Sequence, residues 1–275
     1  MRAENDTPGR EPLDAAGLRR AALRPDGLWR GIEVVPSTGS TNADLLARAL
    51  AGQPEGVVLA AEEQTAGRGR MGRTWTSPPY AALTFSLLLS PAVPPARRGW
   101  LPLLAGVAVA AAVTDVTGVD ARLKWPNDVL AGQGKLAGIL AEAAGDAVVV
   151  GIGLNVSAGP AELPSSGPGA LPATSLRASG ATALNRENLL LAILACFERW
   201  YRTWQQATGD PDRSGLRAEY TRLSATIGRP VRAELPGGQA VSGPAVGVDS
   251  VGRLLVRVSP GSAVPVAAAD VVHLR

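Results

Sequence analysis

The stretch that decides the fold is Gln64-Thr-Ala-Gly-Arg-Gly-Arg-Met-Gly-Arg73, which is followed by Thr74-Trp-Thr-Ser-Pro-Pro79. Gly67, Gly69 and Gly72 satisfy the spacing G-x-G-x-x-G, but a dinucleotide-binding loop needs a helix directly after its glycines. The prolines that follow exclude that helix. Glycines that let the backbone approach a ligand, alternating with fork-shaped guanidinium donors, predict instead a loop that closes over a small anion. A solvated basic turn or an RNA-binding Arg/Gly segment is the alternative.

Hydrophobic periodicity on either side of this loop predicts a mixed α/β fold of the α+β type. Strands are expected over residues 31–35, 57–61, 82–89, 122–125, 136–142 and 147–155, and helices over residues 100–116, 185–206 and 212–223. A further helix is expected after a capping-box-like start at Thr41 and Asp44. Residues 157–182 are predicted to form a loop. From residue 227 the chain alternates short strands with tight turns, including one at 236–238.

Three segments follow from this pattern. Residues 1–28 are expected to be a mobile N-terminal tail with one short helix near residues 18–23. Residues 29–226 are expected to form a mixed β-sheet domain packed with helices. Residues 227–275 are expected to form a small C-terminal β module, most simply a partly open barrel.

Composition excludes several classes of protein. The chain has 275 residues, of which 46% are hydrophobic, and a formal net charge of +3, which argues against disorder and against a general polyanion binder. A single cysteine excludes a disulfide framework. The only histidine, His273, is expected to be a surface residue. Residues 1–30 show no secretory signal, and the most apolar stretch, 101–113, is too short to span a bilayer. We expect a cytoplasmic protein with no membrane partner.

Two further motifs carry chemistry. Leu123-Lys-Trp-Pro-Asn-Asp128 and Lys135-Leu-Ala-Gly138 are expected to place both lysines and one carboxylate at the same end of neighbouring strands, where they could hold phosphate and Mg²⁺. A hairpin with a surface ion pair is the alternative. In Gly151-Ile-Gly-Leu-Asn155, the glycines would admit a flat ring and the amide could bind adenine, although a strand that ends in a glycine bulge explains the motif equally well.

Together these motifs resemble the biotin protein ligases, in the form without an N-terminal DNA-binding domain. The resemblance rests on Gly39-Ser-Thr-Asn42, the arginine-glycine loop, Lys124-Trp-Pro-Asn-Asp128, Lys135-Leu-Ala-Gly-Ile-Leu140 and Gly151-Ile-Gly-Leu-Asn155. They occur in the order of the family and cover about residues 30–160. The C-terminal module is similar to the SH3-like domain of these enzymes. The departure from the family pattern is Met71, where many relatives carry another basic residue.

The resemblance implies a two-step reaction. Biotin and Mg·ATP would give biotinyl-5′-AMP, and a lysine of a carrier domain would then accept the biotinyl group. The implied partner is the biotin carboxyl carrier domain of acetyl-CoA or acyl-CoA carboxylase, or of pyruvate carboxylase, and no direct DNA binding is implied.

The resemblance also implies a role for individual residues. The implied catalytic residues are Arg70, Lys124, Asp128 and Lys135, with Asp128 as a possible Mg²⁺ ligand. The implied biotin contacts are Ser40, Thr41, Asn42, Gln64, Gly67, Arg68, Gly69, Arg70, Lys135 and Gly138. The implied contacts to ATP and the adenylate are Arg68, Arg70, Arg73, Trp75, Lys124, Asn127, Lys135 and Asn155.

Two other functions remain open at this stage. A lipoate ligase or octanoyltransferase would share the catalytic fold, but the Lys-Trp-Pro-Asn-Asp motif and the C-terminal module argue against it. A nucleic-acid-binding regulator would use the arginine-glycine loop directly, and its binding would depend strongly on salt.

Overall fold

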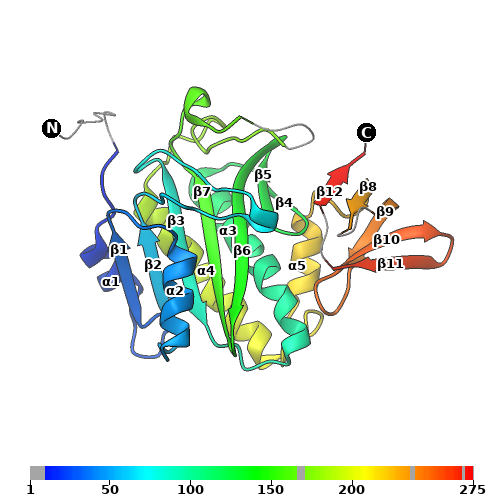
Figure 1. Ribbon diagram of the computed structural model, residues 1–275, viewed down its shortest axis with the longest axis horizontal. Helices are drawn as coiled ribbons and strands as arrows, with labels where there is room; N and C mark the ends of the chain where they lie inside the picture. Colours follow the sequence, from blue (N-terminus) through cyan, green and yellow to red (C-terminus); the bar gives the residue numbers. More distant parts are fainter. Residues whose placement is uncertain (1–9, 166–170, 236–238, 268–269, 275) are drawn as a thin grey trace.

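A seven-stranded mixed sheet forms the centre of the larger domain (Figure 1). The computed structural model describes residues 10–165, 171–235, 239–267 and 270–274. In spatial order the strands are β1 (Gly31–Val35), β2 (Val57–Ala61), β3 (Ala82–Leu89), β7 (Ala147–Asn155), β6 (Gly134–Ala144), β5 (Asp128–Ala131) and β4 (Ala121–Lys124). Only β1 and β2 pair in parallel, and every other neighbouring pair is antiparallel. The predicted mixed sheet is therefore confirmed.

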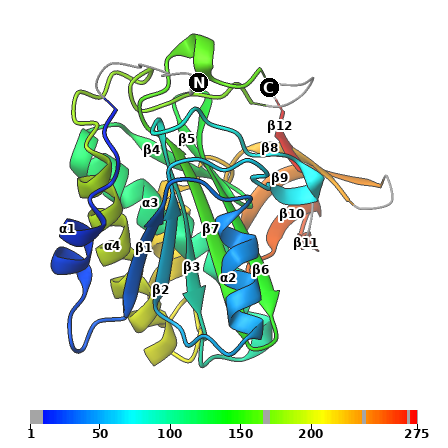
Figure 2. The same ribbon diagram turned by 60° about the vertical axis from the view of Figure 1, so that its left-hand side comes forward.

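Helices cover both faces of this sheet (Figures 1 and 2). On one face lies α2 (Thr41–Leu50), which contacts β2, β3, β6 and β7. On the other face lie α3 (Leu101–Thr117) and α4 (Arg186–Gln206), with α1 (Ala15–Ala22) packed beside α4 and α5 (Leu216–Leu223) beside α3. In the part of the domain that the structure describes, three short 3₁₀ turns also occur: η1 (Arg70–Gly72), η2 (Pro95–Trp100) and η3 (Pro160–Glu162).

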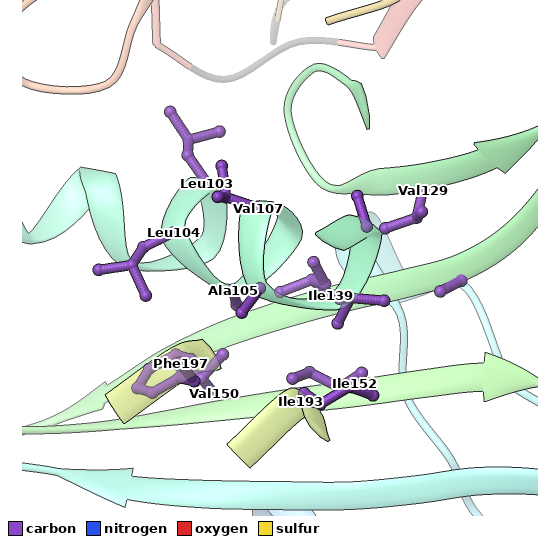
Figure 3. Close-up of a cluster of buried hydrophobic side chains, with 14 of the residues drawn as sticks. Leu103, Leu104, Ala105, Val107, Val129, Ile139, Val150, Ile152, Ile193 and Phe197 are labelled. Atoms are coloured by element: carbon purple, nitrogen blue, oxygen red, sulfur yellow. The ribbon is translucent and has the colours of Figure 1, made fainter. Parts of the chain in front are cut away.

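The main hydrophobic core lies between the sheet and α3 and α4 (Figure 3). Leu104 and Val107 of α3, Ile152 of β7, and Ile193 and Phe197 of α4 are all almost completely buried there. The segment Pro95–Thr117 is long and apolar enough to cross a membrane by length and composition, but most of it is buried inside the protein. Its apolarity is accounted for by this packing.

The start of α2 differs from the sequence prediction. Ser40 is the N-cap residue, and its side chain accepts a hydrogen bond from the backbone N–H of Ala43 at 3.4 Å. Thr41 is therefore the first helical residue, and the carboxylate of Asp44 accepts a hydrogen bond from Thr38 at 2.6 Å. Because the cap lies one residue earlier than predicted, the Thr41 hydroxyl is free to take part in contacts outside the helix.

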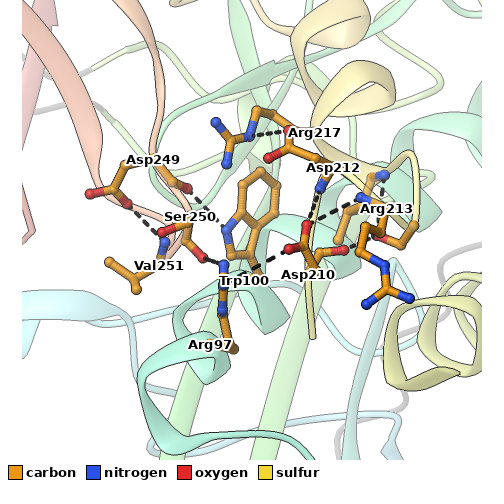
Figure 4. A network of polar contacts seen from close by, with 11 residues as sticks. Arg97, Trp100, Asp210, Asp212, Arg213, Arg217, Asp249, Ser250 and Val251 are labelled. Atoms are coloured by element: carbon orange, nitrogen blue, oxygen red, sulfur yellow. Dashed lines mark hydrogen bonds and ion pairs between the residues drawn. The ribbon is translucent and has the colours of Figure 1, made fainter. Parts of the chain in front are cut away.

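The smaller C-terminal domain is a five-stranded antiparallel sheet. Its spatial order is β11 (Ser262–Val266), β10 (Leu254–Ser259), β9 (Ala240–Val248), β8 (Pro230–Glu234) and β12 (Asp270–His273). The predicted turn at 236–238 lies outside the described residues. Figure 4 shows how the turn between β9 and β10 is fixed to the larger domain: Trp100 Nε1 donates to the carbonyl of Asp249 at 3.1 Å, and Arg97 donates to the carbonyl of Ser250 at 2.8 Å.

The expectation of a mobile tail up to residue 28 is wrong for residues 10–28. Leu13 and Leu18 are buried, and the backbone N–H of Leu13 donates to Glu62 at 2.6 Å. Glu62 in turn forms a buried ion pair with Arg186 of α4, at 2.6 Å. These contacts join residues that are 49 and 124 positions apart, so no local pattern in the first 28 residues could indicate them. Residues 1–9 lie outside the described part of the chain.

Two further differences from the prediction concern β5 and α5. Residues 128–131 form strand β5, although the sequence indicated only a turn at Asn127 and Asp128. Helix α5 begins at Leu216 instead of residue 212, because Gly215 adopts a left-handed conformation (φ 76°) directly before it.

Candidate active site

A cavity of about 840 Å³ opens at one end of the large sheet and extends to the C-terminal domain. All the residues proposed from the sequence line it except Gly67 and Asn155. These are Ser40, Thr41, Asn42, Gln64, Arg68, Gly69, Arg70, Arg73, Trp75, Lys124, Asn127, Asp128, Lys135 and Gly138. The fold therefore collects in one place side chains that the sequence spreads over about 100 residues.

Glycines make the floor of this cavity flat. A methyl group on Gly151 would collide with the side chain of Asn42, and one on Gly153 would collide with the indole ring of Trp75. The indole therefore lies directly against the backbone of β7. Its Nε1 is buried and has no hydrogen-bond partner among the described residues. A buried donor without a partner is unfavourable unless a ligand supplies an acceptor.

One end of the cavity carries a continuous chain of polar side chains. Gln64 Oε1 accepts hydrogen bonds from the backbone N–H of Thr41 at 2.8 Å and from its hydroxyl at 3.0 Å. The Thr41 hydroxyl lies 2.7 Å from that of Ser86, which donates to Asn42 Oδ1 at 2.6 Å. Asn42 Nδ2 donates to Glu142 Oε2 at 2.7 Å.

This chain contains more acceptors than hydrogens. Ser86 gives its only hydroxyl hydrogen to Asn42, so it cannot also donate to Thr41. Thr41 has one hydroxyl hydrogen and two acceptors within reach, Gln64 Oε1 and Ser86 Oγ. Only one of the two can take this hydrogen, although Gln64 Oε1 also accepts the backbone N–H of Thr41. The arrangement therefore suits a ligand that brings N–H donors to this end of the cavity.

The other end of the cavity is cationic. Lys135 Nζ lies 2.7 Å from Asp128 Oδ1, and Arg70 donates to Asn127 Oδ1 at 3.3 Å. Burial lowers the pKa of Lys124, and the nearby charges of Lys135 and the loop arginines lower it further, while Asp128 raises it. Burial also lowers the pKa of Arg70. Among the described residues, six cationic side chains line the cavity but only two carboxylates, Asp128 and Glu234. The surplus of positive charge is one that an anionic ligand would balance.

Asp128 and Lys135 meet for a different reason from the one expected. They do not lie at the same end of neighbouring strands: β5 and β6 are antiparallel, and Asp128 is opposite Gly138, whereas Lys135 is opposite Leu130. The long Lys135 side chain reaches back along the sheet over Gly138. A methyl group added there would already touch its ammonium group, at 3.4 Å.

The arginine-glycine loop folds back on itself. The N–H of Gly69 donates to the carbonyl of Arg73 at 2.7 Å, and the N–H of Trp75 donates to that of Gly67 at 2.9 Å. Met71 takes a left-handed conformation (φ 56°) at the tip and is exposed. No helix follows the loop, as the prolines predicted. A second cavity of about 1050 Å³ lies behind it, lined by Gly67 among others.

Asn155 does not line either cavity. It is buried, and its Nδ2 donates to the carbonyl of Thr174 at 2.9 Å.

Sequence reasoning missed several residues of the site. Ser86, with Thr84 two positions earlier, could have been found, since two hydroxyl residues with period 2 in the apolar strand β3 indicate a polar face. Glu142, Arg229 and His273 carry no local signal. The expectation that His273 is a surface residue is wrong, because its ring is half-buried and lines the cavity.

Comparisons with known proteins identify the family of this chain. Residues 32–157 match the biotin/lipoate A/B protein ligase family, and residues 226–274 match the biotin protein ligase C-terminal domain. The biotin–[acetyl-CoA-carboxylase] ligase of Mycobacterium tuberculosis is 46% identical over 271 residues, which cover 97% of each chain.

Solved structures show the same fold. A biotin protein ligase from Aquifex aeolicus in complex with biotin and ATP matches with a TM-score of 0.73 at 26% identity, covering 90% of this chain and 100% of the other. A biotin protein ligase from Leishmania major in complex with biotinyl-5-AMP matches with a TM-score of 0.60 at 26% identity, covering 90% of this chain and 100% of the other.

The chain therefore belongs to the biotin protein ligase family. It is a ligase that uses biotin and ATP, and the five-stranded C-terminal sheet corresponds to the SH3-like domain expected from the sequence.

Proposed function

We propose that this protein activates biotin as biotinyl-5′-AMP and transfers the biotinyl group to a lysine of a biotin carboxyl carrier domain. The observation that carries the proposal is the polarity of the cavity: at one end, side-chain oxygens that can accept further hydrogen bonds, and at the other end, surplus cations. Biotin has the matching features, because its ureido ring supplies two N–H donors and its valeryl chain ends in a carboxylate. Lipoate, the substrate of related ligases, has no N–H donors.

The ureido ring would lie against the acceptors Thr41 and Gln64, above the flat floor at Gly151 and Gly153. The biotin carboxylate would then extend toward Lys135. In the first step a carboxylate oxygen attacks the α-phosphorus of ATP, and the bond to pyrophosphate breaks. The attacking and attacked groups are both anionic. Lys135, Lys124 and Arg70 would reduce their repulsion, most strongly in the transition state, where charge builds up on the phosphate.

In the second step the amine of the carrier lysine attacks the acyl carbon, and AMP leaves. None of these steps needs a nucleophile from this chain. The buried Nε1 of Trp75 would find its acceptor in the bound adenylate. We assign no adenine contact to the Asn155 side chain, whose Nδ2 is held by Thr174.

The site does not fit a resident Mg²⁺ ion. The Asp128 carboxylate is engaged by Lys135 at 2.7 Å, and no group of three metal-ligating side chains occurs in the described residues. We therefore treat Mg²⁺ as part of the substrate Mg·ATP, held by phosphate oxygens, and leave Asp128 as the partner of Lys135.

The relative from M. tuberculosis is named for acetyl-CoA carboxylase. We infer that the carrier of this chain is the biotin carrier domain of such a carboxylase in the cytoplasm, with the carrier of pyruvate carboxylase as a second candidate.

Calorimetry and carrier labelling test the proposal. Biotin should bind without ATP, and ATP with biotin should release pyrophosphate and give a retained adenylate. A purified carrier domain should then gain one biotinyl group on a single lysine. Lipoate in place of biotin should give neither heat nor labelling. Equal use of lipoate, or strongly salt-dependent binding of nucleic acid with no response to biotin, would contradict the proposal.

A further inference from the structure

His273 connects the C-terminal strand to the active-site cavity. It lies on β12, opposite Val231 of β8. Its ring is half-buried and lines the cavity together with Lys124 and Arg229. Its Nε2 lies 3.0 Å from the hydroxyl oxygen of Thr226, which is completely buried.

The Thr226 hydroxyl holds the end of strand β4. Its oxygen accepts a hydrogen bond from the backbone N–H of Trp125 at 3.1 Å, and Trp125 directly follows Lys124. One residue earlier, the N–H of Ala225 donates to the carbonyl of Leu123 at 2.7 Å. Because β4 is an edge strand of only four residues, these contacts fix its free edge near its last residue.

Lys124 needs such support. Burial and neighbouring cations disfavour its charged form, so the ammonium group would move toward solvent if the backbone allowed it. The C-terminal domain makes a second contact to this segment: the indole Nε1 of Trp125 donates to the carbonyl of Gly252 at 3.1 Å. The turn that carries Gly252 is itself fixed to the larger domain by the network of Figure 4.

A neutral imidazole suits this position. Burial and the positive charges of Lys124 and Arg229 lower the pKa of His273 to about 4, so the ring is uncharged near neutral pH. Its Nε2 can then accept the one hydroxyl hydrogen of Thr226, whose oxygen receives the N–H of Trp125. A lysine or arginine here would add a further charge to a cationic site.

We propose that His273 and Thr226 act together as positioning residues for Lys124. Through them the C-terminal strand holds the end of β4 so that the Lys124 ammonium faces the phosphates of ATP. That the group facing Lys124 is the phosphate chain of ATP rests on the proposed function, whereas the contact that positions Lys124 does not. Neither side chain touches a reacting atom in this scheme.

The test compares ATP with biotin. Thr226→Val removes the hydroxyl at nearly constant shape, and His273→Ala removes its partner. We expect each change to raise the KM for ATP in biotin-dependent pyrophosphate exchange about tenfold, the effect of losing one hydrogen bond of about 1.4 kcal/mol. The dissociation constant for biotin alone should stay within about twofold. Thr226→Ser and His273→Gln, which keep a hydroxyl and an acceptor, should restore the KM for ATP to within about threefold.

The matched control is Thr221→Val, the same substitution at an exposed position on α5, which should change neither constant. Adding His273→Ala to Lys124→Gln should produce no further loss, because the group being positioned is then absent. The inference would be overturned if the KM for ATP and the dissociation constant for biotin changed equally, or if neither changed. It would also be overturned if the effects of His273→Ala and Lys124→Gln on the KM for ATP were fully additive.

If Thr226→Val does not fold, the two His273 variants and the cycle with Lys124→Gln decide the question, because the ring is only half-buried. If the unmodified protein binds neither biotin nor ATP, the proposed function has failed, and the positioning contact is then tested by the hydrogen-exchange protection of the Trp125 N–H in the same variants.

Discussion

Replacing Lys135 by methionine tests the electrostatic account of the site most directly. Methionine keeps a similar length and removes the charge. The Lys135 ammonium lies 2.7 Å from Asp128 Oδ1, and its side chain is 30% exposed. Two unit charges about 4 Å apart interact by about 4 kcal/mol at an effective dielectric constant of about 20. Partial exposure reduces this to about 3 kcal/mol, or about two orders of magnitude in rate.

A second effect adds to the first. Without Lys135, the Asp128 carboxylate loses its partner and repels the incoming carboxylate and phosphate. We therefore expect Lys135→Met to lower kcat/KM for biotin-dependent pyrophosphate exchange by two to three orders of magnitude. The double variant Lys135→Met with Asp128→Asn should recover about tenfold of this loss, because the repelling charge is gone.

Lys135→Arg is the matched control, since it keeps the charge and should lose far less activity than Lys135→Met. Calorimetry with biotin alone shows whether the ureido end of the cavity is still intact. An exchange rate for Lys135→Met within about threefold of the unmodified protein would refute the reasoning, as would a double variant no better than the single one.

Three other predictions follow from the same structure. Arg70→Gly removes the contact to Asn127 and should release the adenylate. Bystander proteins should then be labelled on their lysines. In this protein itself, mass spectrometry should find biotin only at the N-terminus and at the two lysines, Lys124 and Lys135, because every other basic side chain except His273 is arginine. Labelling confined to the carrier would contradict the idea that Arg70 retains the adenylate. ATP binding should raise the lowered pKa of Lys124, so that the complex takes up a proton at alkaline pH. Because the buffer supplies that proton, the calorimetric heat of ATP binding should depend on the buffer for the unmodified protein and should not depend on it for Lys124→Gln. Arg186→Leu leaves Glu62 charged and buried, so the free energy of unfolding in urea should fall by about 3–5 kcal/mol, and adding Glu62→Gln should restore part of it. A fall below about 1 kcal/mol would mean that the ion pair does not stabilise the fold.

Local sequence was enough to predict most strands and helices. The strands over 31–35, 57–61, 82–89 and 147–155 have the predicted bounds, because apolar runs between turn residues depend only on near neighbours. Strand β5 was missed because its four residues, Asp128–Ala131, are too few to show a period. The N-terminal segment was misjudged because the Glu62–Arg186 pair that anchors it comes from distant parts of the chain.

The sequence by itself determined which residue types were available: glycines for a flat floor, arginines on a loop, and two lysines beside one aspartate. The tertiary structure alone decided how they meet. Lys135 reaches Asp128 from the opposite end of an antiparallel pair, over a residue that has no side chain. His273 enters the site from a separate domain. The physical reason is that periodicity reports the surroundings of a residue along one element, whereas a site depends on contacts between elements that only packing brings together.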